Sequence, residues 1–439
     1  MNLRKRVVAA SSWVLAGYAG SQVLRILTNL ILTRLLFPEA FGMMAVIFAV
    51  NAGVTLLSDL GISAGIVIHG SDVNDEYLNT AWTVQVIRGF CIGAFIFCCA
   101  HPLALAFSNL KLEPLFRIVA LGPVLAGFSS TNLALADRNL QAGRKVALDL
   151  GNQLASAIIT ALLALAMRST TALAWGSNLS LVVSVATSHL FLAGPRNRLH
   201  WSKTQVQSII AVGRISLFTS ALTFAAGDGS RLLSGMMVNS RELGLISLAA
   251  GLATMPWQAI QRVAQRVLLP AYAELSRGGD MDRMRRAVLK ARAMQVLPSW
   301  LANFVMVVLA TKIFGVLYDV RYSNAAHVLQ IQSVGMMVGA VSSSYGGVLW
   351  GMRKLRLSLV LQIFQSVVLW LGIWLGYVFG GPVGLVIGSA ASSWAAYPVT
   401  YVIFKRIGLA NLLFDMAIII PSTLCGLALY WLLPAHVTI

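Results

Sequence analysis

Long apolar segments alternate with short polar connectors along the whole length of this 439-residue chain. A run of about 20 apolar residues is long enough to cross the hydrocarbon core of a bilayer as a helix. Thirteen such segments are predicted, at about 8–36, 39–66, 78–106, 114–136, 139–167, 171–193, 206–236, 242–272, 293–318, 323–350, 355–378, 381–404 and 412–433. The pattern therefore predicts an all-α polytopic membrane protein.

The first predicted span carries a row of polar residues, which we call the polar stripe. Its members recur every three or four residues and therefore share one helix face. They are Tyr18, Gln22, Arg25, Asn29 and Thr33. An arginine at the centre of a spanning helix costs about 2.5–3.5 kcal/mol on insertion scales, so it should face a bundle interior or a watery cavity. The stripe predicts a path for a polar solute.

Charged residues also lie within later spans. Arg88 in the third span and Arg214 in the seventh are deep enough to face a cavity. The 14 residues from Arg214 to Asp228 return nearly to the same face of a continuous helix. Asp228 and Arg231, three residues apart, form either a fixed internal ion pair or part of a transport site.

Two further charges lie near the ends of predicted spans. Arg34 either snorkels to the lipid headgroups or faces the cavity, and Asp59 is either a hydrated helix cap or an ion site. Uncharged polar residues occur inside the eighth and tenth spans, at Gln258, Gln261, Gln330 and residues 342–345. Hydrogen bonding between packed helices is the plain alternative for such residues.

The sign of the embedded charge favours an anionic substrate. Guanidinium groups pair with phosphate through two parallel hydrogen bonds and keep their charge when buried, while amides suit sugar hydroxyls. We therefore predict a lipid that carries a phosphorylated sugar head. The candidate substrate-binding residues are Gln22, Arg25, Asn29, Arg34, Arg88, Arg214 and Arg231, and the candidate ion-coupling residues are Asp228 and Asp59.

Composition agrees with a membrane protein, since 58% of the residues are hydrophobic and 11% are charged, against about a quarter charged in soluble domains. The net charge of +18 does not indicate nucleic-acid binding, because 22 of the 33 Lys and Arg residues lie in or beside alternate connectors. Such connectors face the cytoplasm and anionic membrane lipids. We therefore expect a bacterial cytoplasmic (inner) membrane protein with a cytoplasmic N-terminus.

Two local features refine this topology. The apolar run after Arg4, Lys5 and Arg6 is too long for a signal-peptide core, so we expect the first span to be retained. The longest inner connector, 273–292, is rich in arginine and is predicted to form an amphipathic helix on the inner leaflet.

Nothing in the sequence indicates catalysis or a cofactor. The six histidines are scattered without metal-ligand spacing, and the four cysteines lie inside apolar stretches. No phosphate-binding glycine loop or nucleophile elbow occurs, and the outer connectors are only a few residues long. We predict a protein that is not an enzyme and holds no metal or cofactor.

A faint internal repeat predicts the domain organisation. Residues 38–42 align with residues 240–244 at an offset of 202, and each segment is a tight turn between two long apolar helices. The offset keeps the direction of each span, as in transporters with parallel repeats. It predicts an N-terminal lobe at 1–194, a cytoplasmic linker at 195–205, a C-terminal lobe at 206–405 and an additional span at 406–439.

The sequence also resembles a known family. The runs QVLR at 22–25, LTRLLFPEAFG at 32–42 and LSDLG at 57–61 resemble the opening of polysaccharide transporters. Residues 243–270 resemble the eighth span of that family, which includes O-antigen and exopolysaccharide flippases. It belongs to the multidrug/oligosaccharidyl-lipid/polysaccharide exporter superfamily. Its members usually have 12 or 14 spans, so thirteen is a departure.

The resemblance implies two six-helix lobes around a central cavity, related by a parallel pseudo-two-fold axis. It implies movement of undecaprenyl-diphosphate-linked oligosaccharide from the inner to the outer leaflet by alternating access, driven by H⁺, Na⁺ or the membrane potential. Other polysaccharide assembly proteins are implied as partners. The alternatives are a cation-coupled multidrug or small-solute antiporter of the same superfamily and, from a different class, a membrane glycosyltransferase, polymerase or ligase.

The predicted topology is tested by cysteine labelling in a variant that lacks the four native cysteines. Ser240→Cys should react with an impermeant thiol reagent added outside the cell, because residue 240 lies in an outer connector. Arg198→Cys should not react, because it lies in an inner one. Labelling of residue 198 and protection of residue 240 would reverse the orientation and the direction of transport with it.

Overall fold

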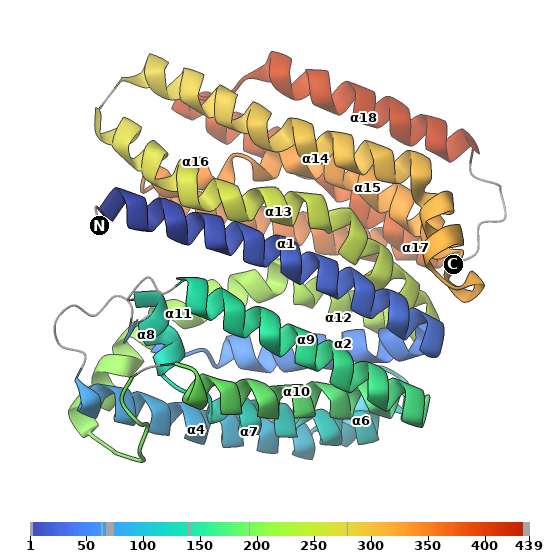
Figure 1. The fold of residues 1–439 in the computed structure, drawn as a ribbon. Coiled ribbons are helices and arrows are strands. Elements are labelled where there is room, and N and C mark those ends of the chain that lie inside the picture. Colours follow the sequence, from blue (N-terminus) through green and yellow to red (C-terminus); the bar gives the residue numbers. More distant parts are fainter. Residues whose placement is uncertain are drawn as a thin grey trace. The chain divides into compact units, whose positions relative to one another are not determined.

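The computed structural model describes residues 3–62, 65–66, 74–138, 142–192, 194–278 and 280–432 (Figure 1). Every regular element in this part of the chain is a helix. Eight of the described helices are long and apolar enough to cross a membrane, or nine if the bent pair 112–127 and 132–138 counts as one span. The prediction of an all-α, multi-pass membrane protein is confirmed.

The chain forms two compact units, Met1–Leu232 and Leu233–Ile439. The helices that begin in the first unit are α1 Leu3–Leu35, α2 Pro38–Leu57, α4 Asp75–Cys98, α5 Ala100–Ala106, α6 Leu112–Val119, α7 Leu121–Gly127, α8 Asn132–Arg138, α9 Ala142–Met167, α10 Thr170–Leu190, α11 Lys203–Ala226 and α12 Asp228–Met237. Those of the second are α13 Ser240–Gly278, α14 Met281–Leu317, α15 Ala325–Ser343, α16 Gly346–Gly351, α17 Leu355–Ile407 and α18 Leu412–Leu432, with a short 3₁₀ turn at Val320–Tyr322.

The boundary between the units falls within α12, later than the linker predicted at 195–205. The reason is the packing of α11, which contacts α2 and α4 of the first unit. At Gly213 the backbone of α11 comes so close to the backbone of Leu60 that a Cβ atom would crowd it. The assignment of residues 206–405 to one repeated lobe therefore stays a prediction.

Small residues set the packing of α1 in the first unit. Gly17 and Gly20 lie against Val146 and Leu150 of α9, with no room for a larger side chain at Gly17. Beside them, the Nε2 atom of Gln153 in α9 donates a hydrogen bond to the carbonyl oxygen of Ser21 at 2.9 Å. Close approach through small residues is typical of helices that pack in lipid, and it fixes which face of α1 is turned to α9.

In the second unit, α15 is the central helix. It contacts α13, α14, α17 and α18 and is buried along most of its length. Helix α17 is a hairpin, since the backbone leaves helical geometry at Gly380 and Gly381, where Gly381 has φ +58°. The two arms touch through the paired glycines Gly372, Gly376, Gly384 and Gly388. This break confirms the predicted connector between residues 378 and 381.

The prediction of a separate amphipathic helix at 273–292 is wrong. Helix α13 extends to Gly278, and α14 begins at Met281 and continues unbroken to Leu317. The side chain of Asp280 caps α14 by accepting a hydrogen bond from the backbone N–H of Arg283 at 2.8 Å. Met284 and Val288 pack into a protein core with Tyr345 and Phe404, so the apolar face of this segment is covered by protein rather than lipid.

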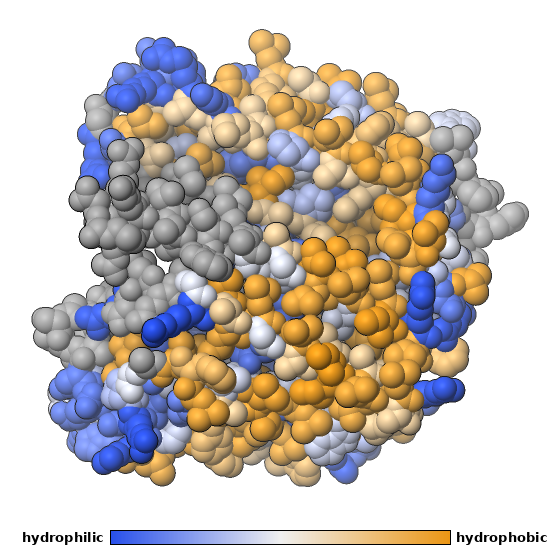
Figure 2. Space-filling model, viewed as in Figure 1, coloured by the Kyte–Doolittle hydropathy of each residue, from blue (hydrophilic) through white to orange (hydrophobic). Residues whose placement is uncertain are grey.

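Apolar side chains are exposed on the outer faces of several helices. Figure 2 shows hydrophobic residues over the middle stretches of the helices and hydrophilic residues gathered near their ends. On α14 the exposed residues include Leu301, Val308 and Val316, and on α17 they include Trp374. Such an apolar surface is expected of helices that are surrounded by lipid, because no water is present there to bind exposed polar groups.

Candidate functional site

The polar stripe of α1 lies on a different face from the one that packs against α9. Residues 17, 20 and 21 face α9, and at about 100° per residue the stripe is turned by roughly 110° from them. Gln22, Arg25 and Asn29 are half-buried. Gln22 donates a hydrogen bond to the hydroxyl of Tyr18. Within the described part of the chain, Arg25 and Asn29 have no polar partner, so both keep their hydrogen-bonding capacity for another molecule.

Arg34 does not lie on the stripe. It is exposed, and its spacings of 11 residues from Val23 and seven from Leu27 place it on the same face as those exposed apolar residues. It also lies in the last turn of α1, where a cation is favoured by the helix dipole. The structure therefore favours the interfacial interpretation of Arg34 over substrate binding.

Arg88 is held by the end of α2. Its Nε atom donates to the hydroxyl of Ser58 at 3.2 Å, and its Nη2 atom donates to the carbonyl oxygen of Thr55. The last carbonyl groups of a helix lack partners within the helix, and a guanidinium group satisfies them while complementing the helix dipole. The geometry of Arg88 is therefore that of a helix cap from a neighbouring helix.

Asp59 links the end of α2, where Arg88 binds, to α11. Its Oδ1 atom accepts a hydrogen bond from the N–H of Gly61 at 3.0 Å, and its Oδ2 atom accepts one from the hydroxyl of Ser220 at 3.2 Å. Gly61 has φ +60°, a conformation that glycine adopts without strain. The LSDLG sequence thus forms a junction of α2, α4 and α11.

The premise of one continuous helix from Arg214 to Asp228 is wrong. Helix α11 ends at Ala226, and Gly227 has non-helical angles of φ −106° and ψ −94° before α12 begins at Asp228. The count of 14 residues therefore does not apply, and the side chain of Arg214 lies outside the described part of the structure. Asp228 instead pairs with Arg231, with 2.8 Å between Oδ1 and Nη1.

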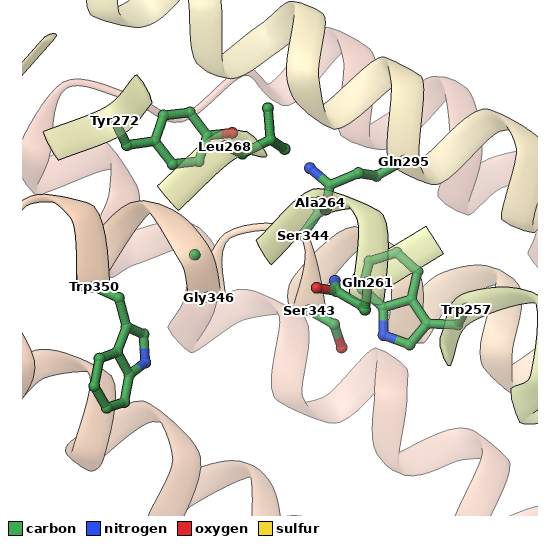
Figure 3. Close-up of a pocket in the computed structure, with 11 residues that line it drawn as sticks. Trp257, Gln261, Ala264, Leu268, Tyr272, Gln295, Ser343, Ser344, Gly346 and Trp350 are labelled. Carbon is green, nitrogen blue, oxygen red and sulfur yellow. The ribbon is translucent and has the colours of Figure 1, made fainter. Parts of the chain in front are cut away.

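The second unit contains a pocket that the sequence did not predict. It has a volume of about 520 Å³. Figure 3 shows its lining from α13, α14, the end of α15 and α16. The residues are Trp257, Gln261, Ala264, Leu268, Tyr272, Gln295, Ser343, Ser344, Gly346, Gly347 and Trp350. The sequence signal was the set of polar residues in the eighth and tenth spans, which include Gln261, Ser343 and Ser344.

A fully buried ion pair lies behind the pocket wall. The Nη2 atom of Arg292 is 2.7 Å from Oδ1 of Asp415, and their side chains are 1% and 0% exposed. The hydroxyls of Tyr345 and Tyr397 donate to Oδ2 of Asp415 at 3.1 and 3.0 Å. The guanidinium of Arg292 also stacks on the Tyr345 ring at 3.5 Å from its centroid. The network therefore joins α14, α17 and α18 to Tyr345, which lies between α15 and α16.

The network also orients one residue of the pocket. The Nε atom of Arg292 donates to the hydroxyl of Ser344 at 2.9 Å, and this hydroxyl donates to the carbonyl oxygen of Val341 at 2.7 Å. Ser344 is thereby fixed in one orientation. The sequence did not predict this ion pair, because a pairing across 123 positions has no local pattern.

The pocket lining determines what it is able to bind. It combines indole rings, amides and hydroxyls, and none of the described residues in the lining is charged. Among the described residues, no group of three His, Cys, Asp or Glu side chains is placed to hold a metal ion. The arrangement suits a neutral molecule with many hydroxyl groups, whereas the stripe of α1 suits an anion.

Comparisons with known proteins identify the family of the chain. Residues 31–327 match the family model described as polysaccharide biosynthesis protein, which covers more than half of the chain. The lipopolysaccharide biosynthesis protein WzxC of Escherichia coli (strain K12) is 21% identical over 392 residues, which are 88% of this chain and 78% of that protein.

Solved structures share the fold. The inward closed form of the lipid II flippase MurJ superposes with a TM-score of 0.74 at 9% identity, covering 98% of this chain and 94% of MurJ. An inward-facing MATE family multidrug transporter of the MOP superfamily has a TM-score of 0.69 at 14% identity, covering 89% and 94% of the two chains. The resemblance seen in the sequence is confirmed, and the chain belongs to the polysaccharide biosynthesis protein family.

Proposed function

We propose that this protein is a flippase that moves an undecaprenyl-diphosphate-linked oligosaccharide from the inner to the outer leaflet of the bacterial cytoplasmic membrane. Transport proceeds by alternating access and serves the synthesis of a surface polysaccharide. The N-terminus is cytoplasmic in this proposal. The observation that carries it is Arg25, a half-buried arginine of α1 that has no polar partner in the described part of the chain.

The chemistry of this position supports the proposal. A guanidinium in apolar surroundings stays charged and is stabilised by an anion that arrives with the substrate. A diphosphate offers oxygens for paired hydrogen bonds to Arg25, and Gln22 and Asn29 on the same face supply amides for the adjoining sugar. The family match supports a role in polysaccharide synthesis, and the fold shared with a lipid II flippase supports lipid-linked cargo.

The fold is also shared with a multidrug transporter, so the antiporter is the competing function. An exporter of organic cations needs a carboxylate that is open to its substrate. Both candidate carboxylates have partners within the protein, because Asp59 accepts hydrogen bonds from Gly61 and Ser220 and Asp228 pairs with Arg231. Since neither carboxylate is open to an organic cation, the flippase is favoured. The enzyme alternatives lack support from the relatives and from the chemistry of the pocket.

Coupling to a gradient of H⁺ or Na⁺ and interaction with other polysaccharide assembly proteins form part of the proposal. Within it, Arg25 is the main anion-binding residue, with Gln22 and Asn29 beside it. Arg88 supports the site by holding the end of α2, and Arg34 acts at the membrane interface. Asp59 is the candidate for ion coupling, whereas Asp228 is assigned a structural pair with Arg231.

Deletion of the gene tests the proposed function. Surface polysaccharide should disappear, and complete lipid-linked oligosaccharide should accumulate in the inner leaflet, because assembly continues while export stops. Incomplete lipid-linked oligosaccharide would instead indicate a biosynthetic enzyme. Unchanged polysaccharide with lost resistance to cationic drugs would indicate the antiporter.

Arg25→Ala should reduce polysaccharide export by about 10-fold to 100-fold, because hydrogen bonds to charged groups contribute about 1.5–3 kcal/mol. Arg25→Lys should restore export only in part, since an ammonium group cannot reproduce the paired geometry. Arg34→Ala is the matched control and should change export little. Protein level in the membrane is measured for each variant, and full export by a normally inserted Arg25→Ala protein would remove Arg25 from the site.

The pair of Asp228 and Arg231 separates a structural role from ion coupling. We expect Asp228→Asn to lower gradient-driven transport in reconstituted vesicles, because it leaves Arg231 without its partner. Adding Arg231→Gln should restore transport, since no lone charge remains. If the double variant stays inactive under the imposed ion gradient, Asp228 is a coupling carboxylate rather than a partner of Arg231.

A further inference from the structure

The pocket of the second unit has an unsatisfied polar group within its lining. Tyr272 is 2% exposed, and its hydroxyl has no hydrogen-bond partner among the described residues. A buried hydroxyl that lacks a hydrogen-bond partner is destabilising, and a ligand in the pocket would supply the missing hydrogen bond. Figure 3 shows this hydroxyl directed toward the space beside Leu268, on the same side as the amide of Gln295.

Two tryptophans give the pocket flat apolar surfaces. Trp257 comes from α13 and is nearly buried, whereas Trp350 comes from α16 and is half-exposed. An indole ring offers a broad apolar face together with one N–H donor. The apolar C–H face of a sugar ring is complementary to such a surface, while its edge carries the hydroxyls.

The remaining lining supplies donors and acceptors around these rings. The amide of Gln261 projects toward the middle of the lining in Figure 3, and Ser343 lies next to it. Ser344 is fixed by Arg292, which is itself held by Asp415 and two tyrosines. A wall that is rigid before the ligand arrives loses less conformational entropy on binding.

The same contacts argue against a charged occupant. Arg292 hydrogen-bonds Ser344 in this wall, and its charge is balanced by Asp415 at 2.7 Å. Among the residues that the structure describes, no carboxylate lines the pocket for an organic cation and no cationic side chain lines it for a diphosphate. The volume of about 520 Å³ falls within the range of about 300–1,000 Å³ usual for small-molecule sites.

We infer that this pocket is a carbohydrate subsite that binds neutral sugar residues of the lipid-linked oligosaccharide. The inference rests on the proposed function and deepens it, because it assigns recognition of the sugar head to α13, α14 and α16 of the second unit. It also makes the protein selective for glycosylated lipid over the bare lipid diphosphate.

The test compares the affinities of two probes for the full-length protein in nanodiscs. One probe is the undecaprenyl-diphosphate-linked repeat unit purified from the host, and the other is undecaprenyl diphosphate without sugar. The unmodified protein should bind the glycosylated probe more tightly. Trp350→Ala should bring the ratio of the two dissociation constants close to one, because Trp350 is half-exposed and its loss leaves the core intact.

Tyr272→Phe is the more specific variant, since it removes only the hydroxyl that lacks a partner. It should lower the affinity for the glycosylated probe by about threefold to 10-fold and leave thermal stability unchanged or slightly higher. Trp374→Ala, at an exposed tryptophan of α17 outside the pocket, is the matched control and should leave the ratio unchanged.

The outcomes separate the inference from the proposed function. A ratio near one in the unmodified protein, or an unchanged ratio in both Trp350→Ala and Tyr272→Phe, overturns the carbohydrate subsite while the flippase proposal stands. Arg25→Ala should weaken both probes by the same factor and keep the ratio. Binding of neither probe by the unmodified protein overturns the proposed function and the subsite together.

Discussion

The cost of holding a charge in apolar surroundings governs the arrangement of this protein. A charged side chain within a membrane must be paired, must satisfy backbone groups or must face water or a ligand. Arg292 meets this demand with Asp415 and two tyrosines, and Arg88 meets it with the last carbonyl groups of α2. Arg25 meets it with no described residue, so an anionic ligand is the natural partner.

The polar stripe of α1 and the pocket of the second unit therefore suit different ligand groups. The stripe of α1 offers a guanidinium and amides, which suit the diphosphate that all lipid-linked substrates share. The described residues of the pocket in the second unit offer indole, amide and hydroxyl groups without a charge, which suit the sugar head that differs between them. Pairing of Arg292 with Asp415 supports this division, because it neutralises an arginine that hydrogen-bonds Ser344 in the pocket wall.

Much of the fold follows from the sequence, whereas much of the site does not. Span length, the turn at Gly381 and the polar face of α1 are local properties, so periodicity is enough to predict them. The break at Gly227 was missed because a glycine within an apolar run does not by itself end a helix. The amphipathic start of α14 was assigned to the membrane surface because periodicity cannot distinguish a lipid-covered face from a protein-covered one. The pair of Arg292 and Asp415 depends on a tertiary contact between residues 123 positions apart. The pocket beside it also depends on tertiary contacts, which local periodicity does not predict.

Transbilayer movement of the substrate by the purified protein tests the central claim most directly. The measurement follows a fluorescent undecaprenyl-diphosphate-linked oligosaccharide in reconstituted vesicles, with a membrane-impermeant quencher that reports how much lies in the outer leaflet. The account predicts that the quenchable fraction rises faster in vesicles that contain the protein than in protein-free vesicles. Equal rates, together with proton-driven uptake of a cationic dye by the protein-containing vesicles, would contradict it.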